Sequence, residues 1–176
     1  MSKTKTATKD SIGGRRALKA RLLSRAMRTK PLFQGLLWTR MPLLAMVSPR
    51  VKELDADHCR IEIPFAWRNR NIFGTMYFAA SVMAAEATTG CLVLFHEAAR
   101  RDTISFIVRG VEADFVKPAR STVTFECVDG DVVASGFAEA AATSERVDRT
   151  LEVIGRREDG KECARVKVFW TWRKKS

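Results

Sequence analysis

A long stretch of apolar and small residues, positions 75–95, dominates the hydrophobic pattern of the chain. It follows Gly74, and a single charged residue, Glu86, interrupts it near its middle. Its length and its richness in alanine predict a helix of about six turns. The helix is expected to end between residues 96 and 100, where basic side chains complement the negative end of the helix dipole.

This stretch is long enough to cross a membrane, but its composition favours a buried helix of a folded domain. It is built largely on Ala, Thr, Ser and Gly. A carboxylate at the centre of a membrane-spanning helix, where Glu86 would lie, costs roughly 2.5–3.5 kcal/mol. We therefore predict that the rest of the domain packs around this helix.

Alternating apolar and polar positions elsewhere predict β-strands. Two strands precede the helix and form a hairpin, and four follow it, of which the last two are joined by a tight turn at residues 158–160. Gly110 suggests a bulge within the first strand after the helix. Residues 131–143 mix helix-forming and strand-forming side chains and are predicted as a short helix. The predicted strands are 49–54, 58–65, 104–115, 123–127, 147–157 and 161–173.

Together these elements predict an α+β domain in which a single antiparallel sheet wraps around one long central helix. Additional helices are expected at the N-terminus. Residues 11–28 repeat apolar positions at helical spacing among lysines and arginines, which predicts a basic amphipathic helix. Residues 31–41 predict a second helix that docks on the domain and stops near Pro42. Residues 1–11 are predicted to be disordered.

The charge pattern divides the chain into a basic tail, residues 1–30, and a folded domain, residues 31–176. The whole chain carries +11, and the tail holds ten Lys or Arg against one Asp, which is a net +9. The domain is therefore close to neutral, which argues against a folded nucleic-acid platform. Three roles for the tail stay open: its leucine stripe packs on the domain, it meets an anionic membrane or acidic partner, or it binds nucleic acid, the least favoured role.

A chain of 176 residues, 46% of them hydrophobic, can build one core without disulfides or metal. Its cysteines form no C-x-x-C pair and are predicted to be reduced and buried, as in a cytoplasmic protein. No secretory signal is expected because Gln34 and Arg40 interrupt the apolar segment 31–47, whereas an organellar transit sequence stays open. The cysteines are Cys59, Cys91, Cys127 and Cys163.

Familiar catalytic signatures, such as a nucleophile elbow, a P-loop or a H-E-x-x-H zinc motif, are missing from the sequence. The only histidines, His58 and His96, have no companion cluster, so both are interpreted as structural. Glu86 is the unusual residue, because its neighbours one helical turn away are small or apolar. Burial would raise the pKa of its carboxyl, as is common at functional sites, unless an arginine or strand amide pairs with it structurally.

The start of the helix is a second candidate for chemistry. Gly74 and the first helical turn are expected to present free backbone N–H groups at the positive end of the helix dipole. Such groups stabilise a developing oxyanion.

The loop from Asn71 to Gly74 and the helix with Glu86, twelve residues after the glycine, resemble those of hotdog-fold acyl-thioesterases. In the phenylacetic-acid-degradation branch of that superfamily the loop reads Asn-x-x-Gly-x-x-His-Gly-Gly, followed by Asp or Glu. Asn71 and Gly74 match this loop, and Glu86, twelve residues after the glycine, matches the acid. A Lys-Pro-Ala turn at 117–119 is also shared. Tyr77-Phe78-Ala79 replaces His-Gly-Gly, so residues 40–175 look most similar to the poorly characterised hotdog group that lacks this motif.

The resemblance implies a hotdog fold and a hydrolase in lipid metabolism that acts on acyl-CoA or an acyl-carrier protein. Coenzyme A would enter as part of the substrate, with no other cofactor and no metal. Glu86 would act as general base or nucleophile on the thioester. The backbone N–H of Phe78 would polarise the carbonyl, and Asn71 would orient the acid, the water or the substrate.

Substrate contacts are expected from six further residues. Arg68 and Arg70 either meet coenzyme A phosphates or an acidic carrier, or remain solvated. Met83 either lines an acyl tunnel or packs in the core, and Thr89 lies near the helper threonine of some relatives. The six are Gly74, Tyr77, Thr89, Met83, Arg68 and Arg70.

The spacing of the two catalytic groups predicts a dimer. Phe78 and Glu86 are eight residues apart on one helix, a separation of about 12 Å at 1.5 Å per residue. Because that is too far for both to act on one carbonyl, they would have to come from different subunits of a homodimer or a dimer of dimers. The alternative is a non-catalytic acyl-binding or dimerisation module, or one that its basic tail tethers to an anionic membrane.

Overall fold

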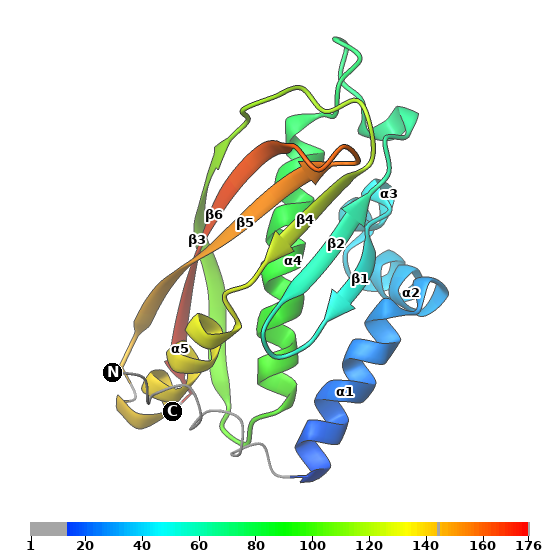
Figure 1. Ribbon diagram of the computed structural model, residues 1–176. Coiled ribbons are helices and arrows are strands. Elements are labelled where there is room, and N and C mark those ends of the chain that lie inside the picture. The colour runs from blue at the N-terminus through cyan, green and yellow to red at the C-terminus, as the bar shows by residue number, and fades with distance from the viewer. Residues whose placement is uncertain (1–13, 144, 176) are drawn as a thin grey trace, which may run out of the picture.

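The computed structural model, which describes residues 14–143 and 145–175, is organised around the helix α4, Phe78–Ala98. Its strands form one antiparallel sheet in the order β1-β2-β4-β5-β6-β3. Figure 1 shows this sheet curving around α4. The α+β class, the single antiparallel sheet and the central helix are therefore confirmed. The strands are β1 (Arg50–Leu54), β2 (Cys59–Ile63), β3 (Ile104–Asp114), β4 (Val123–Cys127), β5 (Val147–Arg157) and β6 (Glu162–Lys174).

The core lies between α4 and the concave face of the sheet. Small side chains on α4, such as Ala84 and Ala85, are fully buried and let the helix axis approach the strands closely. On the sheet side of the core, Ile61 and Phe125 are buried beneath α4. By length and composition α4 alone among the described helices could cross a membrane, but 61% of its apolar window is buried inside the fold.

The tight turn, the bulge and the short helix that the sequence predicts are all present. The β5–β6 hairpin closes at Gly160, whose φ of 76° is a left-handed conformation that suits glycine. The pairing of β3 with β6 shifts register between Val108 and Gly110, which confirms the bulge. The ambiguous segment forms the helix α5, Gly130–Thr143, which covers one end of the sheet. There Phe137 packs against Trp172 with ring centroids 5.7 Å apart.

Three helices precede the sheet: α1 (Gly14–Arg28), α2 (Lys30–Arg40) and α3 (Pro42–Val47). The second confirms the predicted docking helix, since Phe33 and Leu37 are buried. This helix ends at Arg40, which confirms the predicted stop near Pro42. The third helix, α3, was not predicted, and Pro42 lies in its first turn, where proline is tolerated. The short 3₁₀ helix η1, Trp67–Asn69, was also not predicted. The disorder predicted for residues 1–11 lies outside the described residues.

The helix α1 packs on the body by a different face from the one its leucines suggested. Its buried residues are Ala20, Ser24 and Met27, whereas Leu18 and Leu22 are more than half exposed. The Ser24 hydroxyl donates a hydrogen bond to the carbonyl oxygen of Leu54, 2.6 Å away, which fixes α1 to the edge strand β1. Small side chains allow this close approach, and Leu18 and Leu22 are left on the outside, whereas Leu23 packs against the core.

Candidate active site

The sheet leaves one stripe of α4 uncovered, and Glu86 lies in its middle. We call this the open stripe and define it by residues one turn apart that are exposed or only half buried. Because the stripe faces away from the core, its side chains remain available to a ligand or to a second subunit. The open stripe consists of Phe78, Val82, Glu86, Gly90 and Leu94.

The carboxyl group of Glu86 is half buried and has no compensating partner among the described residues. Burial raises the pKa of this carboxyl above its ordinary value, and it is the only cause of the shift. Among the residues that the structure describes, none offers the carboxylate an ion pair or hydrogen bond, so the predicted structural arginine or strand amide is not there. A methyl group on Gly90 would lie 3.6 Å from Oε1 of Glu86, which means that the glycine keeps one side of the carboxyl open.

Asn71 uses its side chain to shape its own loop. Its Oδ1 accepts hydrogen bonds from the backbone N–H groups of Phe73 and Thr75, at 3.0 and 3.1 Å, and Nδ2 donates to the Thr75 hydroxyl. The tip of this loop, residues 70–76, projects at the top of Figure 1. Within one chain, therefore, no hydrogen bond among the described residues joins Asn71 to Glu86.

Gly74 has a different position from the expected one. The helix α4 begins at Phe78, so Gly74 belongs to the loop, where its φ of 69° permits the tight turn. Its N–H donates to the carbonyl oxygen of Asn71 at 3.1 Å and is not free for a substrate oxyanion. The expectation that Gly74 itself presents a free N–H is wrong, because residues 75–77 separate it from the start of α4.

Asn69, which the sequence analysis did not single out, anchors the start of α4. Its side chain is buried and donates from Nδ2 to the carbonyl oxygens of Val47 and Pro64, at 3.0 and 2.9 Å. Its own carbonyl oxygen accepts the N–H of Tyr77 at 2.7 Å, one residue before the helix begins. An asparagine in a polar, arginine-rich loop gives no sequence signal for burial, since its side chain bonds to backbone carbonyls and one of them, that of Val47, is distant along the chain.

The first N–H groups of α4 have no side-chain cap. Tyr77 occupies the N-cap position with extended backbone and makes no capping hydrogen bond. Among the described residues, no acceptor is found for the N–H of Phe78, which matches the donor expected for an oxyanion. The Phe78 ring is half exposed and contacts Tyr77 and Phe115 edge to face, with centroids 5.0 and 6.1 Å away. This aromatic cluster surrounds the helix start.

The remaining predicted substrate residues are scattered around α4. The Thr89 hydroxyl is fully buried and bridges two groups, donating to the Glu86 carbonyl oxygen at 2.9 Å and accepting the Trp170 indole N–H at 3.0 Å. Met83 is half buried and packs against the core. Arg68 donates to the Ser48 hydroxyl at 2.7 Å.

Arg70 lies 4.3 Å above the Phe65 ring and is exposed, as Arg68 is. Both guanidinium groups therefore stand at the base of the loop, where an anionic substrate group can approach.

Phe78 and Glu86 occur on the same straight element, two turns apart, which at 1.5 Å per residue is about 12 Å along the axis. The structure thus places the expected oxyanion donor and the expected acid on one exposed stripe but too far apart to meet at one carbonyl. A site that uses both groups needs a second copy of the chain.

The histidines and cysteines have structural surroundings. Burial lowers the pKa of His96, whose Nε2 lies 2.9 Å from the carbonyl oxygen of Ala56. His58 lies 2.8 Å from a Glu53 carboxylate oxygen. All four cysteines are buried and free. Within residues 14–143 and 145–175, no three His, Cys, Asp or Glu side chains converge as a metal site would require.

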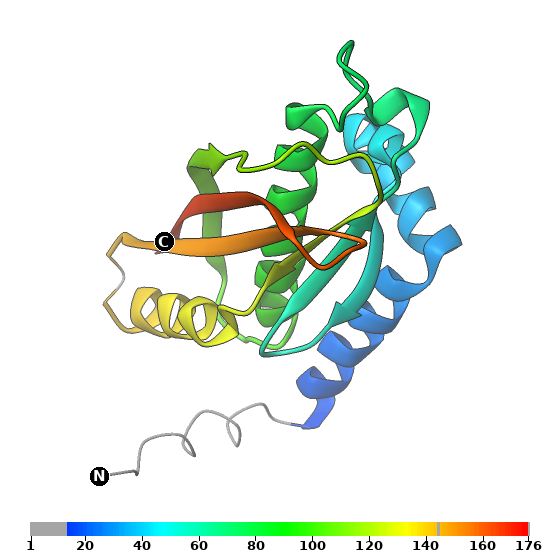
Figure 2. The ribbon, with the colours of Figure 1, turned by 45° about the horizontal axis from the view of Figure 1, so that its top comes forward.

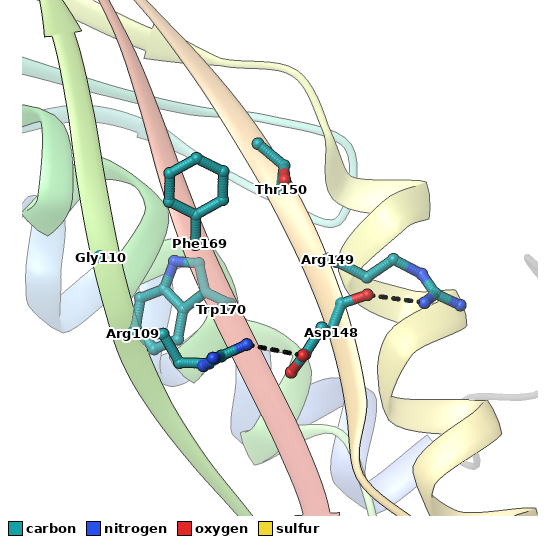
Figure 3. A pocket seen from close by; sticks show the side chains of 7 residues that line it. All are labelled: Arg109, Gly110, Asp148, Arg149, Thr150, Phe169 and Trp170. Carbon is teal, nitrogen blue, oxygen red and sulfur yellow. Dashed lines mark hydrogen bonds and ion pairs between the residues drawn. The ribbon is translucent and has the colours of Figure 1, made fainter.

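A surface hollow of about 460 Å³ lies on the sheet rather than beside Glu86 (Figure 3). Arg109 of β3 reaches across β6 to Asp148 of β5, with Nη1 and Oδ2 2.8 Å apart. Hydrogen bonds from Thr171 and Arg146 lower the pKa of Asp148. Because the acid is already paired, the hollow offers no free catalytic group comparable with Glu86.

Comparison with solved structures identifies the fold. A protein from Pseudomonas aeruginosa, described as a probable thioesterase, superimposes with a TM-score of 0.69 at 22% identity, covering 85% of this chain and 99% of its own. A thioesterase from Haemophilus influenzae gives a TM-score of 0.60 at 14% identity, covering 83% and 91%. A mutant thioesterase from Pseudomonas aeruginosa gives 0.61 at 15% identity, covering 87% and 99%. The chain therefore has the hotdog fold.

Residues 29–172 match the family described as "Domain of unknown function (DUF4442)", and the chain belongs to this family. No curated protein matches it.

Proposed function

We propose that the chain is an acyl-thioester hydrolase that works as a homodimer in the cytoplasm, on an acyl-CoA or an acyl-carrier protein. The observation that carries the proposal is Glu86: a half-buried carboxyl with a raised pKa and no described partner, on the open stripe of the central helix. A buried, uncompensated acid costs stability, and such groups concentrate at functional sites. The solved proteins of the same fold that are described as thioesterases support the reaction class.

In the proposed reaction, Glu86 of one subunit takes a proton from water, and the resulting hydroxide attacks the thioester carbonyl carbon. The N–H of Phe78 of the partner subunit donates a hydrogen bond to the oxyanion that forms. The carbon–sulfur bond then breaks, and Glu86 returns its proton to the leaving thiolate. The products are a carboxylic acid and a thiol. Direct attack by the Glu86 carboxylate, with later hydrolysis of an anhydride, is the alternative route.

Two uncovered surfaces support the dimer. The open stripe leaves apolar side chains such as Leu94 exposed on the central helix. The strand β3 is paired only on its β6 side, and Ile107, Val111 and Phe115 on or beside it are exposed. An unpaired edge strand is a template for pairing with another chain. Joining two copies at β3 would bring their α4 helices side by side and the start of one helix toward Glu86 of the other.

The loop is proposed to bind the carrier end of the substrate. Arg68 and Arg70 are exposed at its base and would face the phosphates of coenzyme A or the acidic surface of a carrier protein. Asn71 and Gly74 would keep the loop in shape, and Asn71 would reach substrate only from the partner subunit. Tyr77 and Met83 would contact the acyl group, and Thr89 would hold the backbone beneath Glu86. No other cofactor is required.

A non-catalytic acyl-binding module is the second candidate, and one observation favours it. The Phe78 ring lies against Phe115 at the start of α4, with centroids 6.1 Å apart, so this side chain narrows the approach to its own N–H group. A substrate carbonyl would have to enter beside the ring.

Hydrolysis of acyl-CoAs of increasing chain length, followed by thiol release, tests the catalytic proposal. We expect Glu86→Gln to lower kcat/KM by about 100-fold to 10,000-fold, the usual contribution of a general base. Glu97→Gln, an exposed glutamate on the same helix, is the matched control and should leave the rate unchanged. If the wild-type protein and both variants bind acyl-CoA but none of them hydrolyses it, the second candidate is established instead.

A further inference from the structure

The N-terminal helices carry only positive charge. Residues 11–52 contain no Asp or Glu. In the part of the chain that the structure describes, the cations of α1 to α3 form no ion pairs, whereas the charged residues of the sheet are extensively paired. The unpaired cations are Arg15, Arg16, Lys19, Arg21, Arg25, Arg28, Lys30 and Arg40.

The same helices expose large apolar side chains. Leu18 and Leu22, one turn apart, are 56% and 57% exposed, because α1 docks by the opposite face. Further exposed leucines and a tryptophan follow on α2 and α3. Figure 1 and Figure 2 both place these helices along one side of the molecule, outside the β1 edge of the sheet. We call this set the apolar ridge: Leu18, Leu22, Leu32, Leu36, Trp38 and Leu43.

A surface groove runs along the junction of α1 with β1 and the turn that follows it, and most of its charged lining residues are cations. Its volume is about 1130 Å³, which is large enough for several phosphate-sized groups. Asp55 and Asp57 are its only acidic lining residues, so the potential inside the groove is positive. The cations that line it are Arg21, Arg25, Arg28, Lys30, Arg50 and Lys52.

We propose that α1 to α3 dock the protein on the surface of an anionic phospholipid bilayer. The cations would bind lipid phosphates, with each contributing attraction near an anionic surface, and the apolar ridge would enter the boundary between headgroups and acyl chains. A helix with an apolar stripe flanked by Lys and Arg has the pattern of helices that lie in a membrane interface. This docking does not depend on the proposed thioesterase activity.

Charge decides between the bilayer and the other possible occupants of this face. A second copy of the chain would place like charges opposite one another, which disfavours a symmetric contact here. Nucleic acid would satisfy the cations but would leave exposed leucines such as Leu22 in water. An anionic bilayer complements both the cations and the apolar ridge.

Vesicle co-sedimentation of the full chain tests the proposal. We expect binding to vesicles of phosphatidylcholine mixed with phosphatidylserine, and weak binding to phosphatidylcholine alone. The double variant Arg21→Gln with Arg25→Gln should weaken binding by about 25-fold, since each cation contributes roughly fivefold. Leu18→Gln with Leu22→Gln should also weaken it, and the binding that remains should be lost at high salt.

The matched control removes two exposed cations elsewhere, Arg173→Gln with Lys174→Gln at the end of β6, for the same change in net charge. Equal losses in the control and in Arg21→Gln with Arg25→Gln would overturn the proposal, because net charge alone would then explain binding. Equal binding to neutral and anionic vesicles would also overturn the proposal. Tight binding of a DNA duplex that vesicles cannot displace would overturn it in favour of nucleic acid, and dissociation of a dimer by the leucine substitutions would overturn it in favour of a second copy of the chain. Circular dichroism of each variant verifies that α1 remains folded.

Discussion

The two faces of α4 serve opposite purposes. The covered face consists of alanines, threonine and larger apolar residues such as Leu92, all closed against the sheet, and it holds the fold together. The open stripe carries a carboxyl that burial penalises, a glycine that weakens the helix and exposed apolar side chains. A helix selected only for stability would contain neither Glu86 nor Gly90. The open stripe therefore carries features that do not serve the stability of the fold, which is the contrast on which the proposed function depends.

The largest expected effect on stability separates the two faces directly. Leu92 is fully buried, so Leu92→Ala should cost about 2–5 kcal/mol of unfolding free energy. Leu94, two residues away, is 38% exposed, and Leu94→Ala should cost less than about 1 kcal/mol in the monomer. Denaturant unfolding of both variants measures the contrast. A large cost for Leu94→Ala that depends on protein concentration would place the dimer contact on the open stripe.

Glu86→Gln should stabilise the protein at neutral pH. Because the pKa of Glu86 is raised in the folded state, ionisation opposes folding: stability is lost as the pH rises through the unfolded pKa, near 4.5, toward the folded value. Removing the charge should gain on the order of 1 kcal/mol, or about 2–4 °C in Tm. The gain should shrink as the pH falls toward 4.5 and vanish well below it, where the carboxyl is protonated in both states. Thermal melts of Glu86→Gln across this pH range, with Glu97→Gln as control, measure the gain in stability.

Much of this architecture follows from local sequence patterns. The central helix, the hairpins, the Gly110 bulge and the Asp-Gly turn depend on periodicity and turn chemistry that neighbouring residues specify. The role of Leu18 and Leu22 could not be predicted in this way, because the docking face of α1 depends on how closely its small residues approach β1. Gly74 was misplaced because the loop continues past it: the Tyr77 N–H donates to the Asn69 carbonyl oxygen, and α4 begins only at Phe78.

Only part of the candidate site can be predicted from the sequence. Glu86 stands out because it is a lone acid in an apolar helix, and the Asn71 and Gly74 spacing marks the loop. The hydrogen bonds of Asn69 with Val47 and of Thr89 with Trp170 join residues far apart in the chain and leave no local pattern.

The smallest effect concerns Gly90. Gly90→Ala should stabilise α4 by about 0.5–1 kcal/mol through helix propensity. Its methyl group would lie 3.6 Å from Oε1 of Glu86, an ordinary contact that further excludes water. Because excluding water should raise the pKa of the Glu86 carboxyl further, the acidic limb of the pH–rate profile should move to higher pH. Gly35→Ala on α2, where a methyl group would meet nothing within 4 Å, should change stability without moving that limb.

The shared site is the central claim, and mixing two inactive variants tests it most directly. Phe78→Pro removes the proposed oxyanion donor at a position where helices tolerate proline, and the extended backbone of Tyr77, with ψ of 128°, suits a residue before proline. Phe78→Ala keeps the N–H and should remain active. Unfolding and refolding Phe78→Pro together with Glu86→Gln should yield mixed dimers in which one site has both defects and the other has none. Acyl-CoA hydrolysis should return to about a quarter of the wild-type rate, whereas a mixture as inactive as its components would contradict a site shared between subunits.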